Sequence, residues 1–486
     1  MNNDEYKFKT KPFEHQQTAL NKCKDKSVYG LLMEMGTGKT KVLIDNIGVL
    51  YNEGAINSAL IVAPKGVYKT WERQEFPKHL PNYIMEHTRL VVWQPNITQK
   101  QSLKMQTLME SVDDLKIFIM NTEAFSTEKG VKYAEKFLLG TKPMFVIDES
   151  TTIKNPRAKR TKNILRLSNL AKYRRILTGQ PVTKSPLDLY TQFNFLDQDI
   201  LNFDSYYSFT NRYATLMRRS VGTHSFDSIV GYRNLNELSE KIKPHSYRIL
   251  KEDCLDLPDK IYMKRIISLT PEQKRVYDDL KRQALAEFNN DETVTVTNAL
   301  ATLSKIHQVV CGHVITDMGR IEEIKNNRLK ELLEILDECS GKVIIWASFR
   351  ESIKQIEKAI QEKYKDKQVV ATYFGDTPAD ERQDVIERFQ DPKDKLRFFV
   401  GNQSTGGYGI TLTAANTVIY YSNTFDLEKR IQSEDRAHRI GQNNKVTYID
   451  IVTEGTIDEK VIKSLRAKRD IASEVMGENF IRDWLS

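Results

Sequence analysis

The sequence of 486 residues lacks the features of a disulfide-stabilised or membrane-spanning protein. Its four cysteines, Cys23, Cys254, Cys311 and Cys339, are far apart and form no CxxC pair. Scattered thiols of this kind are typical of a reducing compartment. No apolar run approaches the roughly 20 residues of a membrane span, and the start, MNNDEYKFKTKPF, has no apolar signal region. We therefore expect a soluble intracellular protein that makes no membrane contact.

A strong charge of one sign is also lacking. Lys and Arg number 73 and Asp and Glu 65, which gives a formal net charge of +8. This mild excess permits a nucleic-acid partner without demanding one. There is no acidic or basic tail and no low-complexity segment. The apolar content of 40% is sufficient for large cores, and the length predicts two to four domains of roughly 100–200 residues each.

One segment contains several side chains that bind metals. HQVVCGH, residues 307–313, contains His307, Cys311 and His313, which could contribute three metal ligands. A structural metal site normally needs four ligands, and no fourth lies nearby in the sequence. We therefore prefer the interpretation that this segment is the partly buried end of a helix.

Two regions of the chain alternate short apolar segments with stretches long enough for helices. This alternation is typical of a doubly wound parallel sheet, whose strands read as continuous apolar runs because helices cover both faces. In the first region the expected strands are 29–34, 58–64, 116–121, 144–149 and 174–179. In the second they are 342–348, 369–374, 396–401, 416–422 and 445–452.

The residues between these two regions have a different character. Residues 200–250 are rich in Tyr, Ser and Asn, and a charged, proline-bearing linker follows. Helices are predicted at 270–288, where Thr270 and Pro271 form a start signal, and at 298–310 and 328–339. A long helix is predicted at 456–476. The expected organisation is a first α/β lobe at 1–198, a mainly helical insertion with linker at 199–325, and a second α/β lobe with a C-terminal helix at 326–486.

The segment LLMEMGTGKTKVL, residues 31–43, has the pattern of a phosphate-binding loop. A strand is followed by two glycines and then by a helix, so backbone N–H groups and the helix N-terminus can face an anion. Lys39 can neutralise the β- and γ-phosphates, and the hydroxyl of Thr40 can bind Mg²⁺. Met33 stands where the strict motif has its first glycine. The predicted nucleotide-binding residues of this loop are Gly36, Thr37, Gly38, Lys39 and Thr40.

An acidic pair follows another expected strand. MFVIDES places Asp148 and Glu149 directly after an apolar run. A nucleotide hydrolase needs one carboxylate for its metal and another to activate water. We therefore predict that Asp148 holds Mg²⁺ and that Glu149 acts on the attacking water.

Two arginines lie close together in the second α/β region. In QSEDRAHRIGQ, residues 432–442, Arg436 and Arg439 are three residues apart and would share a face near a helix end. Such arginines can act as fingers on a γ-phosphate. Since the phosphate loop and the arginines are on different lobes, the sequence predicts a cleft that closes on ATP.

Together these segments make the sequence similar to the superfamily-two helicase-like ATPases, and specifically to the Swi/Snf-type DNA translocases. The resemblance runs from about Phe13 to about Lys468. QSEDRAHRIGQ and the segment at 401–421 are its most specific parts, and the long insertion before residue 342 also fits. The other matching segments are FEHQQTAL (13–20), MEMGTGKT (33–40), LIVAPKGVYKTWERQEF (60–76), DESTTIKNP (148–156), ILTGQP (176–181) and LKEDCLDLPDKIY (250–262).

The resemblance implies two RecA-like lobes, a DNA-dependent ATPase activity with ATP and Mg²⁺, and double-stranded DNA as the partner. It assigns Gln16 to adenine recognition and adds Gln432 to the catalytic set. Sequence-independent contacts with DNA phosphates would suit such a motor. The residues expected to contact DNA are Lys65, Trp71, Lys154, Asn155 and Thr411.

The sequence also departs from the family pattern. Ser150 and Thr151 stand where Ala and His are usual, and Gln180 stands where the family has Thr in its TGTP motif. We expect hydrolysis to survive these changes, whereas the coupling between ATP state and DNA grip is in doubt.

The expected function is therefore ATP-driven movement along duplex DNA by a monomer, without obligatory strand separation. A strand-separating or branch-migrating helicase acting on DNA or RNA is an alternative, and a non-catalytic ATP-regulated binding module is another. The Lys-, Asn- and Ile-rich composition suggests a bacterial or phage protein, in the cytoplasm, or a nuclear one if the source is eukaryotic.

Overall fold

The chain folds into two compact units, each built on a parallel β-sheet. The computed structural model describes residues 6–65, 68–96, 98–221, 224–290, 296–316, 318–378, 381–406 and 410–478. The first unit contains the described residues within 1–216, 229–256 and 471–479, and the second contains those within 217–228 and 257–470. The segment 199–325 therefore contributes residues to both units.

The first unit has a seven-stranded sheet in the order β3-β4-β2-β5-β6-β1-β9. All neighbouring strands in it are parallel. The carboxyl ends of β1, β5 and β6 therefore meet at one edge, which is where such sheets place their ligands. The strands are β1 (Val28–Met33), β2 (Ser58–Ala63), β3 (Thr88–Val92), β4 (Leu115–Asn121), β5 (Pro143–Asp148), β6 (Tyr173–Leu177) and β9 (Ser246–Ile249).

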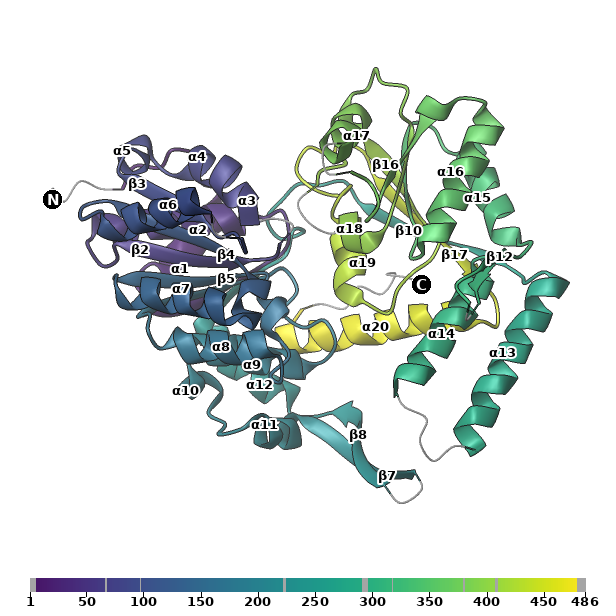
Figure 1. Cartoon of the computed structure of the whole chain (residues 1–486), viewed down its shortest axis with the longest axis horizontal. Coiled ribbons are helices and arrows are strands. Elements are labelled where there is room, and N and C mark those ends of the chain that lie inside the picture. The colour runs from purple at the N-terminus through teal and green to yellow at the C-terminus, as the bar shows by residue number, and fades with distance from the viewer. Residues whose placement is uncertain are drawn as a thin grey trace. The chain divides into compact units, whose positions relative to one another are not determined.

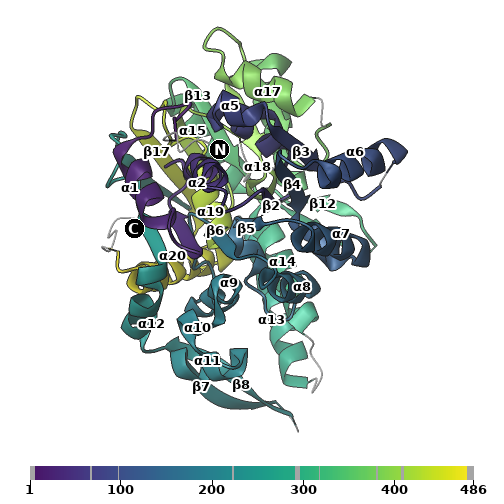
Figure 2. The same ribbon diagram turned by 90° about the vertical axis from the view of Figure 1, so that its left-hand side faces the viewer.

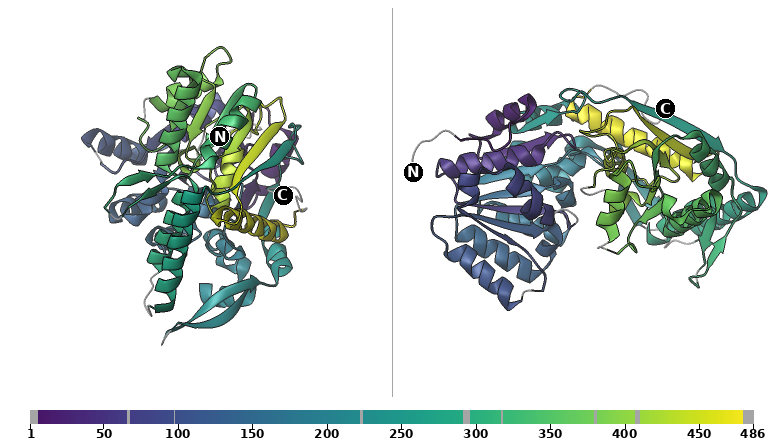
Figure 3. Two further views of the ribbon diagram at one scale, coloured as in Figure 1. Left: turned by 90° about the vertical axis from the view of Figure 1, so that its right-hand side faces the viewer. Right: turned by 90° about the horizontal axis from the view of Figure 1, so that it is seen from above.

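Helices cover both faces of this sheet (Figures 1 and 3). The face formed by Leu31, Ile61 and Ile119 packs on helices α1, α2 and α4. The opposite face, which includes Leu60 and Phe118, packs on α6 to α9. The bounds are α1 (Glu14–Cys23), α2 (Lys39–Asn52), α3 (Tyr68–Thr70), α4 (Phe76–His79), α5 (Asn82–Met85), α6 (Gln99–Glu110), α7 (Glu128–Leu139), α8 (Lys159–Ser168), α9 (Leu189–Leu196), α10 (Gln198–Leu201), α11 (Tyr206–Tyr213) and α12 (Leu235–Ile242).

The second unit has a six-stranded parallel sheet in the order β10-β17-β16-β13-β15-β14. Its core residues Val343, Ile345 and Val400 pack with α15 and α16, and Ile344 and Phe399 pack with α17 on the other face. The strands are β10 (Lys260–Ile267), β13 (Lys342–Trp346), β14 (Val370–Tyr373), β15 (Phe398–Gly401), β16 (Ala415–Tyr420) and β17 (Val446–Thr453). The helices are α13 (Pro271–Asn290), α14 (Val296–Val310), α15 (Asn327–Glu338), α16 (Arg350–Tyr364), α17 (Glu381–Gln390), α18 (Gln403–Gly406), α19 (Leu427–Glu434) and α20 (Ile457–Met476).

The structure confirms the predicted fold class of two parallel-sheet α/β lobes with a C-terminal helix. All ten predicted strands are present, and α13, α14, α15 and α20 lie where helices were expected. The insertion contains more strand than predicted, because a two-stranded ribbon follows α11 (Figure 2). The ribbon consists of β7 (Ala214–Val221) and β8 (His224–Tyr232), and a second short hairpin consists of β11 (His313–Ile315) and β12 (Ile321–Glu323). None of the described helices is long and apolar enough to cross a membrane.

The HQVVCGH segment forms the end of α14, the following turn and the start of β11. The part of the chain that the structure describes holds no group of three or more His, Cys, Asp or Glu side chains arranged for a metal ion. His307 instead approaches Asp458 at the start of α20, with 3.5 Å between Nε2 and the carboxylate. Asp458 also pairs with the buried Arg328 of α15. This buried cluster joins α14, α15 and α20.

We expect this cluster to make the stability of the second unit depend on pH. Burial disfavours the charged form of His307, but Cys311 and Asp458 outweigh burial and raise its pKa to about 9. Since the unfolded value is about 6.5, the charged histidine stabilises the fold fully below pH of about 6.5, and this contribution is lost as pH rises through about 9. The expected loss is about 3 kcal/mol. Urea unfolding of the wild type and of His307→Gln, below pH of about 6.5 and above pH of about 9, measures this loss. An equal pH dependence of the unfolding free energy in the two proteins would contradict the prediction.

Candidate nucleotide site

The loop after β1 has the conformation that a phosphate-binding loop requires. Gly36 and Gly38 have φ of 87° and 92°, in the left-handed region where glycine carries little penalty. Gly38 is the residue that caps the N-terminus of α2. A Cβ at Gly38 would lie 2.2 Å from Nε2 of Gln16, so no side chain fits there without displacing Gln16. The first N–H groups of α2 therefore begin at this loop, and a helix N-terminus is a position that favours an anion.

Two side chains of α1 hold this loop from behind. Gln16 donates from Nε2 to the carbonyl of Thr37 at 3.0 Å, and His15 Nε2 lies 2.8 Å from the same carbonyl. The Oε1 atom of Gln16 accepts from the N–H of Phe13 at 3.0 Å. Thr37 is fully buried, and its hydroxyl donates to the carbonyl of Glu34 at 2.7 Å. Gln16, which the resemblance assigns to adenine, therefore also fixes the loop, as does His15, which was not predicted.

Lys39, at the start of α2, and Asp148, at the end of β5, lie close enough to interact electrostatically. Lys39 is 8% exposed, and its Nζ is 3.5 Å from the carbonyl of Glu34. Burial raises the pKa of the Asp148 carboxyl, while the charge of Lys39 and a hydrogen bond from Trp71 act in the opposite direction. A carboxylate whose ionised form is disfavoured by burial gains from a bound cation. Half-buried Thr40 follows Lys39 at the start of α2 and offers a hydroxyl oxygen.

Trp71 is buried, whereas a contact with DNA needs an exposed side chain. The ring is 2% exposed and packs with Phe76 in the core of the first unit. Its indole Nε1 donates to Oδ2 of Asp148 at 3.1 Å, and the N–H of Glu149 donates to Oδ1 at 3.0 Å. A buried ring has no face for a phosphate backbone. We therefore replace the expected DNA contact by a positioning role, in which Trp71 fixes the orientation of the Asp148 carboxylate.

Glu149 has an unusual backbone. Its φ of 49° and ψ of 63° are left-handed, which is uncommon for a residue other than glycine. Such conformations cost about 1–3 kcal/mol and persist where the surrounding structure imposes them, often at functional sites. The sharp turn separates Glu149 from the line of β5 immediately after Asp148. The two adjacent carboxylates can therefore have different tasks.

Ser150, one of the residues that depart from the family pattern, begins a buried hydrogen-bond chain. The hydroxyl of Ser150 donates to Oε1 of Gln192 at 2.6 Å. The amide of Gln192 donates in turn to the carbonyls of Pro181 and Asp188, each at 2.8 Å. Pro181 belongs to the TGQP segment after β6. The acidic segment and the TGQP segment are therefore connected through Gln192 of α9. The coupling between ATP state and DNA grip, which these departures put in doubt, stays untested.

The residues of the loop and the acidic pair fit Mg²⁺ and a nucleotide phosphate. Mg²⁺ prefers oxygen ligands and is commonly held by one or two carboxylates together with substrate phosphates. Asp148 and Thr40 offer such oxygens, and Lys39 offers the compensating charge.

In the second unit, α19 is held by a buried charge network. Arg430 donates to Glu434 at 2.9 Å and to Asp450 of β17 at 2.5 Å, and its guanidinium lies 3.4 Å from the ring centre of Tyr420. Burial alone would raise the pKa of Glu434, but Lys260 and Arg430 lower it to about 2. This network was not predicted, and it fixes the helix that precedes the two predicted fingers.

Arg436 and Arg439 lie in the turns after α19, because that helix ends at Glu434 rather than continuing through them. Both still converge on one acceptor, the carbonyl of Ile410, with donor distances of 3.2 Å for Arg436 and 3.4 Å for Arg439. Arg436 is 2% exposed and also donates to the carbonyl of Gln432 at 2.9 Å, whereas Arg439 is half-buried. Gln432 itself is buried, and its amide donates to Glu428 at 3.3 Å. Arg439 is thus better placed to reach a ligand, and Arg436 to hold the turn.

The other expected DNA contacts have varied surroundings. Lys65 and Asn155 are exposed, and Thr411 is half-buried. Lys154 is also half-buried, and its Nζ donates to the hydroxyl of Thr183 at 2.6 Å. Their role in DNA binding stays a prediction, and for Lys154 it competes with this internal hydrogen bond.

Comparison with known proteins shows the family. Residues 15–314 match the model of the SNF2-related domain, and residues 324–441 match that of the helicase conserved C-terminal domain. The chain therefore belongs to the SNF2-related family, as its motifs indicated.

Individual relatives are more distant. The chain is 25% identical over 470 residues to the uncharacterized ATP-dependent helicase MG018 of Mycoplasma genitalium, covering 95% of this chain and 41% of that protein. It is 24% identical over 468 residues to the putative ATP-dependent helicase/translocase YwqA of Bacillus subtilis, covering 93% and 47%. The chain thus spans less than half the length of these relatives. A solved structure, the SWI2/SNF2 ATPase core of Sulfolobus solfataricus in complex with dsDNA, is 25% identical, with 97% of this chain and 94% of that chain covered and a TM-score of 0.44.

Proposed function

We propose that this protein is an ATPase that uses hydrolysis to move along double-stranded DNA or to remodel complexes on it. The observation that carries the ATPase part is the proximity of Lys39 to the Asp148–Glu149 pair beside a glycine loop that Gln16 closes from behind. Membership of the SNF2-related family supports the proposal that DNA is the track. Relatives described as ATP-dependent helicases support the motor function.

In the proposed reaction each residue has a separate task. The N–H groups at the start of α2 and the ammonium of Lys39 bind the phosphates, while Thr40 and Asp148 would hold Mg²⁺. The metal would neutralise charge that develops on the phosphate oxygens. Trp71 fixes the orientation of the Asp148 carboxylate. Glu149 orients the attacking water and accepts its proton.

The arginines supply the remaining stabilisation in this proposal. Arg439 donates to the γ-phosphate when the two units close on ATP, and Arg436 holds the turn that carries it. Closure would depend on DNA that contacts both units, which would make hydrolysis DNA-dependent. The hydrogen-bond chain from Ser150 through Gln192 to Pro181 offers a route by which the acidic segment and the TGQP segment respond to each other.

We expect duplex DNA to stimulate ATP hydrolysis more than single-stranded DNA or RNA does. Duplex that bridges both units would favour closure, and phosphate contacts make this stimulation sensitive to salt. The duplex concentration needed for half-maximal stimulation should rise roughly 10²-fold between about 50 and about 200 mM salt if about four phosphates are neutralised. Steady-state ATPase assays with the three nucleic acids measure this.

The same assays separate the alternatives. Equal turnover with and without duplex at low salt would refute the DNA-dependent motor. Stronger stimulation by RNA, or displacement of a labelled strand during turnover, would favour a strand-separating helicase. Binding of ATP without hydrolysis would favour a regulated binding module.

A further inference from the structure

The second unit has an edge strand whose outer side carries apolar side chains. Strand β10 ends the sheet, and β17 is its only strand partner in the described part of the chain. Ile261, Met263 and Ile266 on this strand are 41%, 45% and 67% exposed. An edge strand of eight residues with exposed apolar side chains is a template for pairing with another strand.

The hydrogen bonds to β17 show which backbone groups face outward. The carbonyl of Asp259, just before β10, accepts from the N–H of Val446 at 3.1 Å. The carbonyl of Ile267, the last residue of β10, accepts from the N–H of Glu454 at 2.9 Å. In a parallel pair every second residue bonds to the same neighbour, so the odd-numbered residues of β10 face β17. The backbone N–H and C=O groups of Tyr262, Lys264 and Ile266 therefore face away from the sheet.

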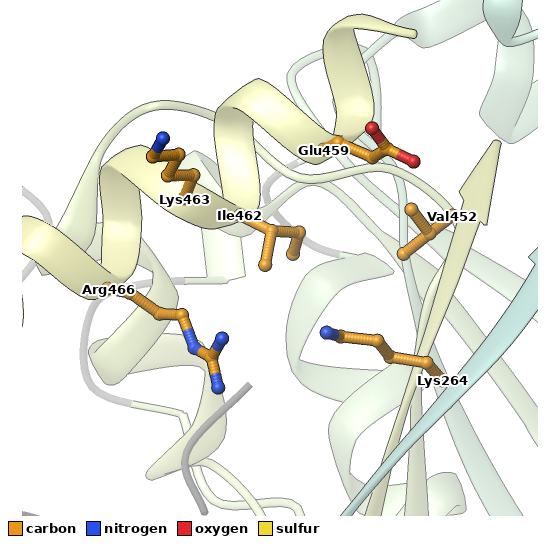
Figure 4. A pocket seen from close by; sticks show the side chains of 6 residues that line it. All are labelled: Lys264, Val452, Glu459, Ile462, Lys463 and Arg466. Atoms are coloured by element: carbon orange, nitrogen blue, oxygen red, sulfur yellow. The ribbon is translucent and has the colours of Figure 1, made fainter. Parts of the chain in front are cut away.

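A basic pocket lies beside this edge (Figure 4). It has a volume of about 350 Å³ and lies between β10, β17 and α20. Three cationic side chains and one carboxylate surround an apolar floor. The lining residues are Lys264, Val452, Glu459, Ile462, Lys463 and Arg466. Burial and the nearby charge of Arg466 lower the pKa of Lys264, while the carboxylates of Asp450 and Glu459 act in the opposite direction.

The two faces of β10 differ in a regular way. Lys264 lines the pocket, and Ile266 is in register with Val452, another lining residue, so both lie on the pocket face. Ile261 and Met263 alternate with them and lie on the opposite face. In a strand added to β10, every second side chain would therefore lie on the pocket face, beside the cationic side chains. The side chains between them would lie on the other face, beside Ile261 and Met263.

We propose that the outer edge of β10 is a docking site for an extended segment of a partner protein in which acidic and apolar residues alternate. The backbone of the segment pairs with Tyr262, Lys264 and Ile266, as in other complexes formed by strand addition. Its carboxylates on the pocket face meet Lys264, Lys463 and Arg466. Its apolar side chains on the other face cover Ile261 and Met263.

A peptide fits these features better than duplex DNA does. DNA would use the cations, but it offers no backbone donors and acceptors at strand spacing and would leave Ile261 and Met263 uncovered. A strand edge with no partner among the described residues, exposed apolar side chains and a basic pocket together favour an acidic peptide.

The test uses the whole chain and a fluorescein-labelled peptide of about ten alternating Glu and Val residues. We expect saturable binding by fluorescence anisotropy. Ile266→Pro removes an outward N–H without removing a bond to β17, and Lys463→Glu reverses a charge at the pocket. Each should raise the Kd about tenfold or more, the size expected for loss of one charge-assisted or backbone contact. Lys463 is exposed on α20, so Lys463→Glu tests the proposal even if Ile266→Pro impairs folding.

Matched controls make the result specific. Ile266→Val keeps the N–H and a branched apolar side chain, and Lys330→Glu reverses a charge on α15 of the same unit, where the lysine is 78% exposed. Both should leave the Kd within about twofold, since neither removes a proposed contact. The proposal is overturned if the peptide does not bind, if a Lys-Val peptide binds equally well, or if a labelled duplex displaces the peptide and loses affinity in the same variants.

Discussion

Replacing Lys39 with alanine is expected to abolish ATP hydrolysis. Lys39 is nearly buried at the start of α2, and its charge already acts on Asp148. Removing it takes away the main positive charge near the β- and γ-phosphates, in a site where solvent screens poorly. Loss of a single donor of this kind typically costs about 10²–10³ in rate, and the loss of a full charge should cost at least as much. Steady-state ATPase at saturating duplex measures the effect.

A second variant shows whether chemistry or binding is lost. Glu149→Gln keeps the shape of the side chain and removes only its ability to accept a proton, so it should bind an ATP analogue with near-normal affinity and hydrolyse slowly. Lys39→Ala should weaken both. Lys26→Ala, an exposed lysine of the same unit, is the matched control and should change neither. Near-normal turnover of Glu149→Gln would show that Glu149 is not the base.

Central strands could be predicted from the sequence because burial on both faces demands continuous apolar runs. Residues 58–63 and 115–121 are entirely buried, and both segments were recognised. Strands β3, β9 and β10 were not recognised, because they lie at or near sheet edges where polar and apolar residues mix. β10 in particular mixes half-buried and exposed positions, and its start was taken for part of the linker.

The residues of the nucleotide site that belong to local motifs were also predictable. A loop such as Gly36–Lys39 has a backbone conformation that only certain residues allow, so its sequence is diagnostic. The supporting contacts are not local. Trp71 is 77 residues from Asp148, and Ser150 is 42 residues from Gln192. No spacing rule connects such pairs, which is why the positioning role of Trp71 and the chain through Gln192 emerge only from the fold.

The two arginines illustrate how burial separates residues that the sequence presents as equivalent. Both belong to QSEDRAHRIGQ, and both were expected to act as fingers. In the structure, Arg436 is almost completely buried and donates to two backbone carbonyls within its own unit. Removing its side chain would take away both of these hydrogen bonds and leave a cavity in the turn, which destabilises the fold. Arg436→Ala should therefore lower the unfolding temperature as well as turnover.

Arg439→Ala is expected to leave the fold and nucleotide binding nearly intact while turnover collapses. Arg439 is only half-buried, and its hydrogen bond to the carbonyl of Ile410 is long, at 3.4 Å, so we expect its removal to cost less stability than that of the buried Arg436. An arginine finger stabilises charge that develops in the transition state, and typical fingers contribute about 10³–10⁵ in rate. Arg439→Lys should rescue poorly, because lysine lacks the planar fork of donors. The measurements are ATPase with saturating duplex, ATP-analogue binding and thermal unfolding on the same samples.

The competing interpretation is that the turn after α19 is a solvated, charged segment without a catalytic role. Arg282 of α13 represents that situation, since it is 77% exposed and pairs with Asp279 one helical turn away. Arg282→Ala should leave turnover unchanged, because an exposed ion pair contributes little. If Arg439→Ala behaves like Arg282→Ala, the second unit has no arginine finger at this position. If Arg439→Ala loses turnover but keeps nucleotide binding and its unfolding temperature, the lost interaction is one made in the transition state. A folding defect would have lowered the unfolding temperature, and a binding defect would have weakened nucleotide binding.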